Sequence, residues 1–208
     1  MIQEFTAQIS AAWHSTSWVE FIAAILAVAY LGLAIRQHIG CWAAAFISSC
    51  LYVWVMFAAR LYMESVLNTF YAAMALYGYR QWTRGQLDGR RLVVSRWAAS
   101  RHSLALLAVV AMSVVTSFLL RRFTPAAWPF WDSMAAWASV FATFLVARKV
   151  YENWHWWLVI DSLSLWLYYS RGLYVTMLLF GLYLLMIVAG MREWRRALGP
   201  ASNVAQHA

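Results

Sequence analysis

The sequence has little charge. Only 12% of its 208 residues are Asp, Glu, Lys or Arg, roughly half the share found in an ordinary soluble domain. Hydrophobic residues make up 64% of the chain, which excludes a water-soluble globular protein. A disordered chain is also excluded, because disorder requires low hydrophobicity and this sequence contains 14 Trp, 11 Tyr and 11 Phe. We therefore expect lipid to surround most of the protein.

The sequence motifs of common catalytic and metal sites are also missing. The five histidines are scattered, without an HExxH motif or a pair at i, i+4, and two cysteines cannot build a zinc cluster. Cys41 and Cys50 would be about 13 Å apart along a helix, so they cannot form a disulfide with each other. No GxxxxGK[ST] loop is present, which excludes ATP-driven transport by this chain alone. The sequence predicts no enzyme, no cofactor and no metal.

What the sequence does contain is a series of apolar stretches long enough to cross a bilayer. There are seven: 19–35, 40–59, 61–79, 104–120, 131–147, 153–169 and 173–190. Because backbone groups in hydrocarbon must pair within their own segment, we expect each stretch to be a helix. Residues 1–18 lack a basic region and an A-x-A-type cleavage site, so we expect no removable signal peptide. The expected fold class is an all-α membrane protein with seven transmembrane helices.

Lys and Arg residues lie between these stretches and are unevenly distributed. Twelve fall in segments on one side of the membrane and four on the other. Because basic residues accumulate on the cytoplasmic side, we expect a multi-pass protein of the bacterial inner membrane with its N-terminus outside and its C-terminus in the cytoplasm. The same distribution accounts for the net charge of +8, so no nucleic-acid partner is expected.

An internal repeat relates the two halves of the chain. An offset of 112 residues aligns 20–82 with 132–194 without a gap, and 16 of the 63 positions are identical. The extra helix at 104–120 restores the chain direction, so two parallel three-helix repeats joined by a linker helix are expected. In transporters built from repeats, the substrate site lies near the membrane midplane where the repeats meet.

This repeat defines the expected organisation of the chain. In order, we expect a periplasmic N-terminal segment, a first three-helix bundle, a basic cytoplasmic connection, a linker helix, a second three-helix bundle and a cytoplasmic tail: 1–18, 19–82, 83–103, 104–120, 131–194 and 195–208.

One acidic residue lies deep in the sixth apolar stretch. Asp161 is about 12 Å from the cytoplasmic end of that stretch, close to the middle of a roughly 30 Å hydrocarbon core, where a charge is costly. Helical spacing places Trp154, Trp157, Ser164 and Tyr168 on the same face. A carboxylate beside aromatic rings can bind a cation, because the acid supplies charge and the rings supply cation–π attraction. The alternative is that Asp161 pairs with an arginine or makes a polar contact between helices.

Polar residues of the first repeat provide further candidates. Asn68 and Tyr71 share one face of the third stretch, where Asn68 could contact a ligand or form a hydrogen bond between helices. Glu64, on the same face, lies nearer the outer interface and could simply be hydrated, and Asp132 is expected to be an interfacial anchor. Ser49 occupies the position in the first repeat that Asp161 occupies in the second. The halves therefore differ where a ligand would bind.

Five motifs spread over about 20–196 are distinctive: RKxxENWxxW from Arg148, PFWDS from Pro129, GLY from Gly172, LY from Leu61 and YGxxxW from Tyr77. Together they resemble the PnuC family of vitamin transporters. The resemblance implies a 3+1+3 fold similar to sugar facilitators of the SWEET type, often in a homotrimer. It also implies facilitated diffusion of nicotinamide riboside, which a separate cytoplasmic kinase traps by phosphorylation.

Two positions depart from the pattern of members associated with nicotinamide riboside: those members tend to have Asn where this chain has Asp161 and Gln where it has Asn68. Relatives are thought to transport thiamine or riboflavin. Nicotinamide riboside and thiamine are flat-ringed cations that suit Asp161, whereas neutral riboflavin suits it less. We expect nicotinamide riboside as the small-molecule substrate, with thiamine second. A proton-coupled transporter in which Asp161 carries the proton, and a membrane subunit that transports nothing, are the remaining alternatives.

Overall fold

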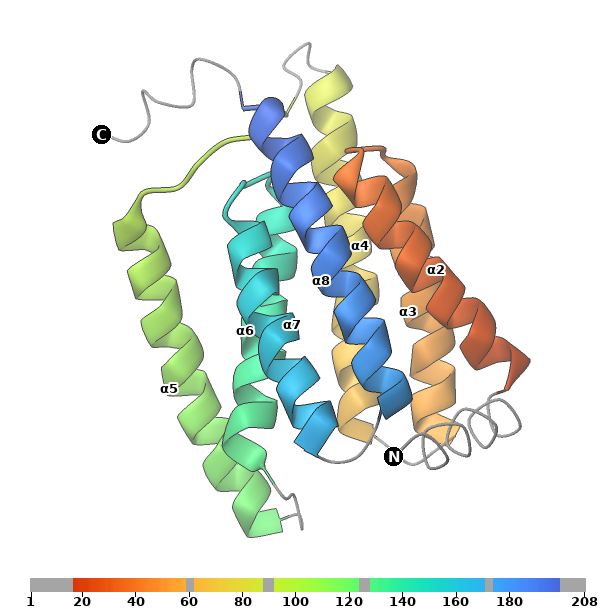
Figure 1. The fold of residues 1–208 in the computed structure, drawn as a ribbon, viewed down its shortest axis with the longest axis vertical. Coiled ribbons are helices and arrows are strands. Elements are labelled where there is room, and N and C mark those ends of the chain that lie inside the picture. The colour runs from red at the N-terminus through yellow and green to blue at the C-terminus, as the bar shows by residue number, and fades with distance from the viewer. Residues whose placement is uncertain (1–16, 59–61, 88–91, 124–127, 171–173, 199–208) are drawn as a thin grey trace.

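The computed structural model describes residues 17–58, 62–87, 92–123, 128–170 and 174–198 (Figure 1). This part of the chain contains seven helices: α2 (Trp18–Ile35), α3 (Gly40–Ala58), α4 (Tyr62–Leu87), α5 (Ala99–Phe123), α6 (Pro129–Ala147), α7 (Asn153–Ser170) and α8 (Tyr174–Arg196). Each of the seven predicted stretches corresponds to one helix, so the expectation of an all-helical chain is confirmed. The predicted N-terminal segment and tail lie almost wholly outside the described residues.

Three helices extend well beyond the predicted apolar stretches. α4 continues to Leu87, α5 begins at Ala99, and α8 continues to Arg196. The added turns contain arginines, which end an apolar stretch but do not interrupt the backbone hydrogen bonds of a helix. The expected basic connection at 83–103 is therefore helical at both of its ends.

The seven helices are not equally apolar. Within the described residues, five are long and apolar enough to cross a membrane: α2, α3, α5, α6 and the part of α8 from Met177 onward. α4 and α7 are too polar to meet that criterion by composition. Both have neighbours on more than one side, because α4 packs against α3 and α6, and α7 packs against α6 and α8.

The helices form two neighbouring groups (Figure 1). α3 packs between α2 and α4, and α7 packs between α6 and α8. The groups meet where α4 packs against α6 and where α2 packs against α8. α5 packs against α6 at the edge of the bundle, and its long apolar side chains are exposed along its length.

The turns that follow α2 and α6 have the same backbone geometry at positions 112 residues apart. Gln37 and Lys149 both have positive φ angles, of 53° and 51°. The amides of His38 and Val150 each donate to a carbonyl five residues earlier, at 2.9 Å. Both helices therefore end in a Schellman motif, with a residue other than glycine in the left-handed position. The left-handed conformation costs about 1–2 kcal/mol for a residue with a Cβ. Its occurrence in both turns therefore supports a structural correspondence between the two turns.

Two glycine–tryptophan contacts repeat at the same offset. Gly78 of α4 faces the indole of Trp42, and Gly190 of α8 faces the indole of Trp154. A Cβ placed on either glycine would lie 2.4 Å from a ring atom, so only glycine allows these helices to approach the rings. Each of these indoles also meets a second tryptophan edge-on, with ring centroids 5.4 and 5.5 Å apart.

The second tryptophan of each pair connects the two groups of helices. The indole N–H of Trp82, in α4, donates to the backbone carbonyl of Ala147 at the end of α6, at 3.2 Å. The indole N–H of Trp194, in α8, donates to the carbonyl of Ala34 near the end of α2, at 3.0 Å. Each group thus donates one buried hydrogen bond to the other.

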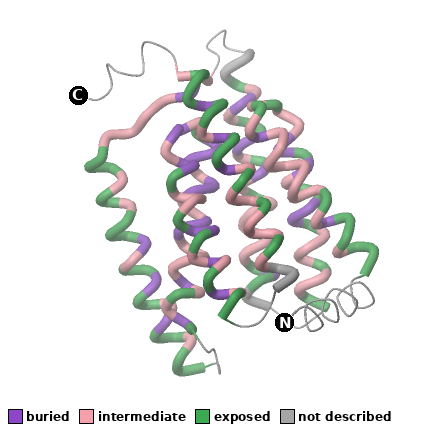
Figure 2. The backbone as a smooth tube through the Cα atoms, viewed as in Figure 1, coloured by how far each residue is buried: buried purple, intermediate pink, exposed green. Residues whose placement is uncertain are grey.

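A contact between the two turns completes this region. Lys149 Nζ donates to Gln37 Oε1 at 3.2 Å and lies 4.4 Å from the ring centroid of Trp82. We call the cross-group contacts of Lys149, Gln37, Trp82 and Trp194 the Lys149 layer. Figure 2 shows that buried positions gather at this end of the bundle, which is also where the main hydrophobic cluster lies. We call it the Lys149 end, and the opposite end, where α4 and α6 begin, the Glu64 end.

The connection before α5 is bound to the Lys149 end. Ser95 N–H donates to the carbonyl of Lys149 at 3.0 Å, and Tyr151 N–H donates to the carbonyl of Ser95 at 2.8 Å. The amide of Trp97 donates to the Glu152 carboxylate at 3.2 Å. This part of the basic connection is therefore held against the bundle by specific backbone pairing.

Candidate functional site

A cavity of about 600 Å³ lies between the two groups of helices. Its walls come mainly from α2 and α4 on one side and from α6, α7 and α8 on the other. This volume is within the range of sites that enclose small organic molecules. α4 and α7, the two helices too polar to meet the criterion for a membrane span, supply much of its polar lining.

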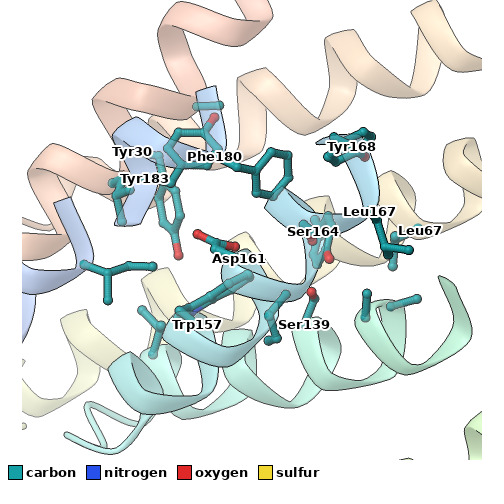
Figure 3. Close-up of a pocket in the computed structure, with 18 of the residues that line it drawn as sticks. Tyr30, Leu67, Ser139, Trp157, Asp161, Ser164, Leu167, Tyr168, Phe180 and Tyr183 are labelled. Carbon is teal, nitrogen blue, oxygen red and sulfur yellow. The ribbon is translucent and has the colours of Figure 1, made fainter. Parts of the chain in front are cut away.

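Asp161 faces this cavity from the middle of α7. Its residue is 5% exposed, and within the described part of the chain it has no hydrogen bond and no ion pair. Figure 3 shows its carboxyl group directed into the cavity, with Trp157 on one side and Tyr183 and Phe180 on the other. No Lys, Arg or His is among the described residues that line the cavity. The alternative in which an arginine neutralises Asp161 therefore finds no support in the structure.

The other predicted residues of α7 also line the cavity. Trp154, Trp157, Ser164 and Tyr168 all contribute, as their helical spacing with Asp161 predicts. They differ in how much surface they offer. Trp154 is 1% exposed, because it packs against α8, whereas Trp157 is only partly buried and stands beside Asp161 in Figure 3.

Of the candidates on α4, one lines the cavity and the other does not. Tyr71 lines the cavity, together with Glu64 and Leu67 at i−7 and i−4 on the same helix. Asn68 lies on the flank of that face and is not part of the lining; its amide donates to the carbonyl of Glu64 at 2.9 Å, within its own helix. The structure thus places Asn68 outside the cavity, in the local role of a hydrogen bond to the backbone.

Ser49 is also outside the cavity. It is buried in α3, and α3 contributes no described residue to the lining, whereas its repeat counterpart α7 contributes more than any other helix. Alignment of the repeats placed Ser49 opposite Asp161, but the cavity is displaced toward α6, α7 and α8. The two aligned segments therefore contribute unequally to the cavity.

Several lining residues were not predicted as site residues: Tyr30, Glu64, Asp132, Ser139, Phe180 and Tyr183. The repeat offers a signal for Tyr183, since it corresponds to Tyr71. Glu64 and Asp132 were interpreted as interfacial groups, and the structure shows that both line the cavity. Tyr30 has no signal in the sequence, because its helix is apolar on all sides and does not indicate which face meets a cavity.

The cavity is closed at one end. At the Lys149 end its lining residues Ala34, Val146, Trp154 and Ile187 are at most 3% exposed. At the Glu64 end the lining includes the exposed residue Glu64 and the partly exposed residue Asp132. Among the described residues, the lining is therefore more exposed at the Glu64 end than at the Lys149 end.

Comparison with known proteins identifies the family. The family model described as nicotinamide mononucleotide transporter matches residues 17–196, which is most of the chain. The chain belongs to this family. The family indicated by the motifs is thereby confirmed, and its members are transporters rather than enzymes. Membership, together with the apolar helices, makes this chain a multi-pass membrane transport protein.

Individual relatives differ in what they are named for. The chain is 27% identical over 211 residues to the nicotinamide riboside transporter PnuC of Escherichia coli K12, covering 89% of this chain and 88% of the relative. It is 28% identical over 182 residues to the riboflavin/roseoflavin transporter RibM of Streptomyces davaonensis, covering 85% and 84%. A crystal structure of the vitamin B3 transporter PnuC has the same fold, with a TM-score of 0.70 at 21% identity over 94% of this chain and 88% of that one.

Proposed function

We propose that this protein mediates facilitated uptake of nicotinamide riboside across the bacterial inner membrane. The observation that carries the proposal is Asp161, a buried carboxylate without a partner among the described residues, facing a cavity of about 600 Å³. An uncompensated buried charge is costly, and a ligand that carries a positive charge removes the cost when it binds. The pyridinium ring of nicotinamide riboside is such a cation.

The roles of the site residues follow from the chemistry of that substrate. Trp157 stacks against the flat ring, Trp154 contributes to the same wall of the cavity, and Asp161 neutralises the charge of the ring. The hydroxyl groups of Tyr71, Ser164 and Tyr168 form hydrogen bonds with the ribose. Asn68 and Ser49 take no direct part, since neither lines the cavity.

The proposed architecture is a 3+1+3 fold of two parallel repeats, in which α2–α4 and α6–α8 are the repeats and α5 is the linker helix. The matched Schellman turns, glycine–tryptophan contacts and tryptophan pairs support it, since each recurs at an offset of 112 residues. In the proposed orientation the N-terminus is outside and the Lys149 end is cytoplasmic. The protein is proposed to assemble as a homotrimer and to rely on a cytoplasmic kinase that traps the substrate.

Transport is proposed to occur by alternating access. The described lining is more exposed at the Glu64 end, while the Lys149 layer connects the two groups of helices at the other end. Rocking of one group against the other would exchange the open and closed ends around Asp161. The Lys149 layer is then the set of contacts that must separate before the substrate is released to the cytoplasm.

Two other substrates are candidates within the same family. Thiamine shares the cationic ring that Asp161 suits. Riboflavin is favoured by the relative RibM, although its neutral ring leaves the charge of Asp161 uncompensated. Two alternatives to facilitated diffusion remain. A proton-coupled transporter would use Asp161 as the proton carrier, and a subunit without transport activity would bind none of the three vitamins.

The test compares binding and transport by purified protein. Calorimetry with nicotinamide riboside, thiamine and riboflavin is expected to show saturable binding of nicotinamide riboside. Asp161→Asn is expected to weaken that binding at least tenfold, about 1.4 kcal/mol, while Ser162→Ala, on the exposed side of the same helix, leaves it unchanged. Unchanged affinity in Asp161→Asn contradicts the role of the charge. Uptake into vesicles with the pH gradient collapsed is expected to persist, and its loss would favour proton coupling.

A further inference from the structure

His102 lies in the first turn of α5 and contacts residues from three different parts of the chain. Its Nδ1 accepts a hydrogen bond from the indole N–H of Trp156, in α7, at 3.3 Å. Its Nε2 lies 3.8 Å from a carboxylate oxygen of Glu152, in the turn before α7. Its ring also meets Trp97, in the connection before α5, at a centroid distance of 6.0 Å. His102 therefore joins α5, α7 and the connection at the Lys149 end.

The bond to Trp156 connects His102 to the helix that carries Asp161. Within the described residues α5 packs against α6 alone, so this bond reaches past α6 to α7. The indoles of Trp156 and Trp157 both pack against a buried cluster that α5, α6 and α7 share. Trp157 stands beside Asp161 in the cavity (Figure 3). The rotation of α7 that directs both side chains is therefore fixed partly by a hydrogen bond outside the cavity.

The two protonation states of His102 favour different contacts. In the neutral ring Nδ1 is the acceptor for Trp156, so the proton lies on Nε2. In the protonated ring both nitrogens are donors, so Nδ1 can no longer accept from Trp156, while Nε2 forms an ion pair with Glu152. Histidine is the side chain that changes charge between about pH 5 and 8, so both states are reached under ordinary conditions.

Other charged groups surround His102. Glu152 also accepts a backbone N–H from the connection at 3.2 Å and lies 4.0 Å from Arg96 Nε. His155, exposed in the first turn of α7, adds a positive charge at low pH that acts on His102. Arg101, on α5 itself, is stacked on a tryptophan of the connection, with its guanidinium carbon 5.7 Å from the ring centroid. Of these groups, only the carboxylate attracts the imidazolium.

We infer that His102 is a positioning residue for the substrate site and makes substrate affinity depend on pH. The neutral imidazole holds Trp156 and, through it, the rotation of α7. When a proton binds, the bond to Trp156 breaks and the start of α5 is drawn toward Glu152. Because α7 then loses a contact that directs Trp157 and Asp161, KM rises while kcat is unchanged. The inference rests on the proposed function, because it regulates the same site.

The first measurement follows the hydrogen bond and requires no transport. In protein with isotope-labelled tryptophan, the indole signal of Trp156, assigned by its loss in Trp156→Phe, is recorded by NMR between about pH 7.5 and 5.5. The signal is expected to move upfield as its acceptor is lost. In His102→Asn, whose amide oxygen accepts a hydrogen bond but does not titrate, it is expected to stay constant. A wild-type signal that is independent of pH would overturn the inference, whatever the protein transports.

The second measurement is initial uptake of nicotinamide riboside in proteoliposomes with the same pH on both sides. Between about pH 7.5 and 5.5, KM of the wild type is expected to rise about threefold relative to that of His102→Asn. Because both proteins contain Asp161, the comparison removes any pH dependence from that residue. The matched control is His38→Asn, which is expected to keep the wild-type profile. His38 Nδ1 also accepts a hydrogen bond, from the Gly40 amide at 3.1 Å, but it lies in the turn after α2.

The outcomes separate this inference from the proposed function. If the wild type and His102→Asn share one KM profile, the positioning role is refuted while the role of Asp161 stands. If His102→Asn fails to fold, Trp156→Phe decides, because it has no N–H to donate to His102. Its KM should equal the low-pH value of the wild type at every pH, and a KM equal to the high-pH value overturns the inference. If the wild type transports no nicotinamide riboside, the proposed function fails, and the indole signal still tests the hydrogen bond.

Discussion

The contact between Gly190 and Trp154 predicts a large effect from the addition of one methyl group. A Cβ at Gly190 would lie 2.4 Å from Cη2 of Trp154 and 2.6 Å from two further ring atoms. The indole cannot easily withdraw, because Trp194 meets it edge-on at a ring-centroid distance of 5.5 Å and Trp154 is 1% exposed. Gly190→Ala must therefore separate α8 from α7.

The magnitude follows from two opposing effects. Overpacking of a well-packed core costs up to about 3 kcal/mol, and three close ring contacts place this site at the upper end. Replacing a helical glycine by alanine stabilises the folded state by about 1 kcal/mol, because alanine loses less backbone entropy on folding. The net loss is about 2 kcal/mol, which lowers Tm by roughly 4–8 °C for a chain of this size.

Gly181 in the same helix provides the matched control. A Cβ at Gly181 meets nothing within 4 Å, so Gly181→Ala gains the backbone term alone and is expected to raise Tm by about 1–4 °C. The assay is thermal unfolding of the purified protein in detergent. Gly78→Ala, which would meet Trp42 at the same 2.4 Å, is expected to resemble Gly190→Ala. A Tm for Gly190→Ala at or above that of Gly181→Ala would refute the packing argument.

Two further predictions concern the contacts at the Lys149 end. Trp82→Phe and Trp194→Phe each remove one buried indole donor and keep a ring, so each is expected to destabilise the protein by about 1 kcal/mol, as measured by thermal unfolding; a large effect of only one would contradict their matched roles. Glu152→Gln weakens the acceptor of the Trp97 amide, so hydrogen exchange at that amide is expected to accelerate. Glu193→Gln, which removes an exposed pairing with an arginine one turn away, is the control and should leave that amide unchanged.

The seven helices were largely predictable, because each depends on properties of a single segment. Apolar length identified all seven helices, and the charges between them accounted for where the apolar stretches end. Where prediction and structure differ, as at the end of α4, a helix continues through arginines that a hydropathy criterion treats as a boundary. The sequence repeat aligns Trp42 with Trp154 and Gly78 with Gly190, and the structure shows that each glycine contacts the tryptophan of its own half.

The candidate site was predictable only in part. Asp161 and its neighbours on α7 share one face of one helix, and helical periodicity determines that face directly. Asn68 shows where prediction from the sequence fails. It follows Leu67, which lines the cavity, but Asn68 itself does not. Which of the two side chains faces the cavity depends on the rotation of α4 about its axis relative to α6. That rotation depends on packing between helices and has no signature in the periodicity of α4.

By itself, the sequence determined that this chain forms apolar helices in two related sets and that a carboxylate lies deep in one of them, because length, hydropathy and spacing are properties of each segment alone. The tertiary structure decided that the cavity lies nearer the second set, that α3 and Ser49 do not reach it, and that Glu64 and Asp132 line it. The physical reason is that a cavity is the space left between packed helices, and its position depends on the relative rotation and separation of all of them at once.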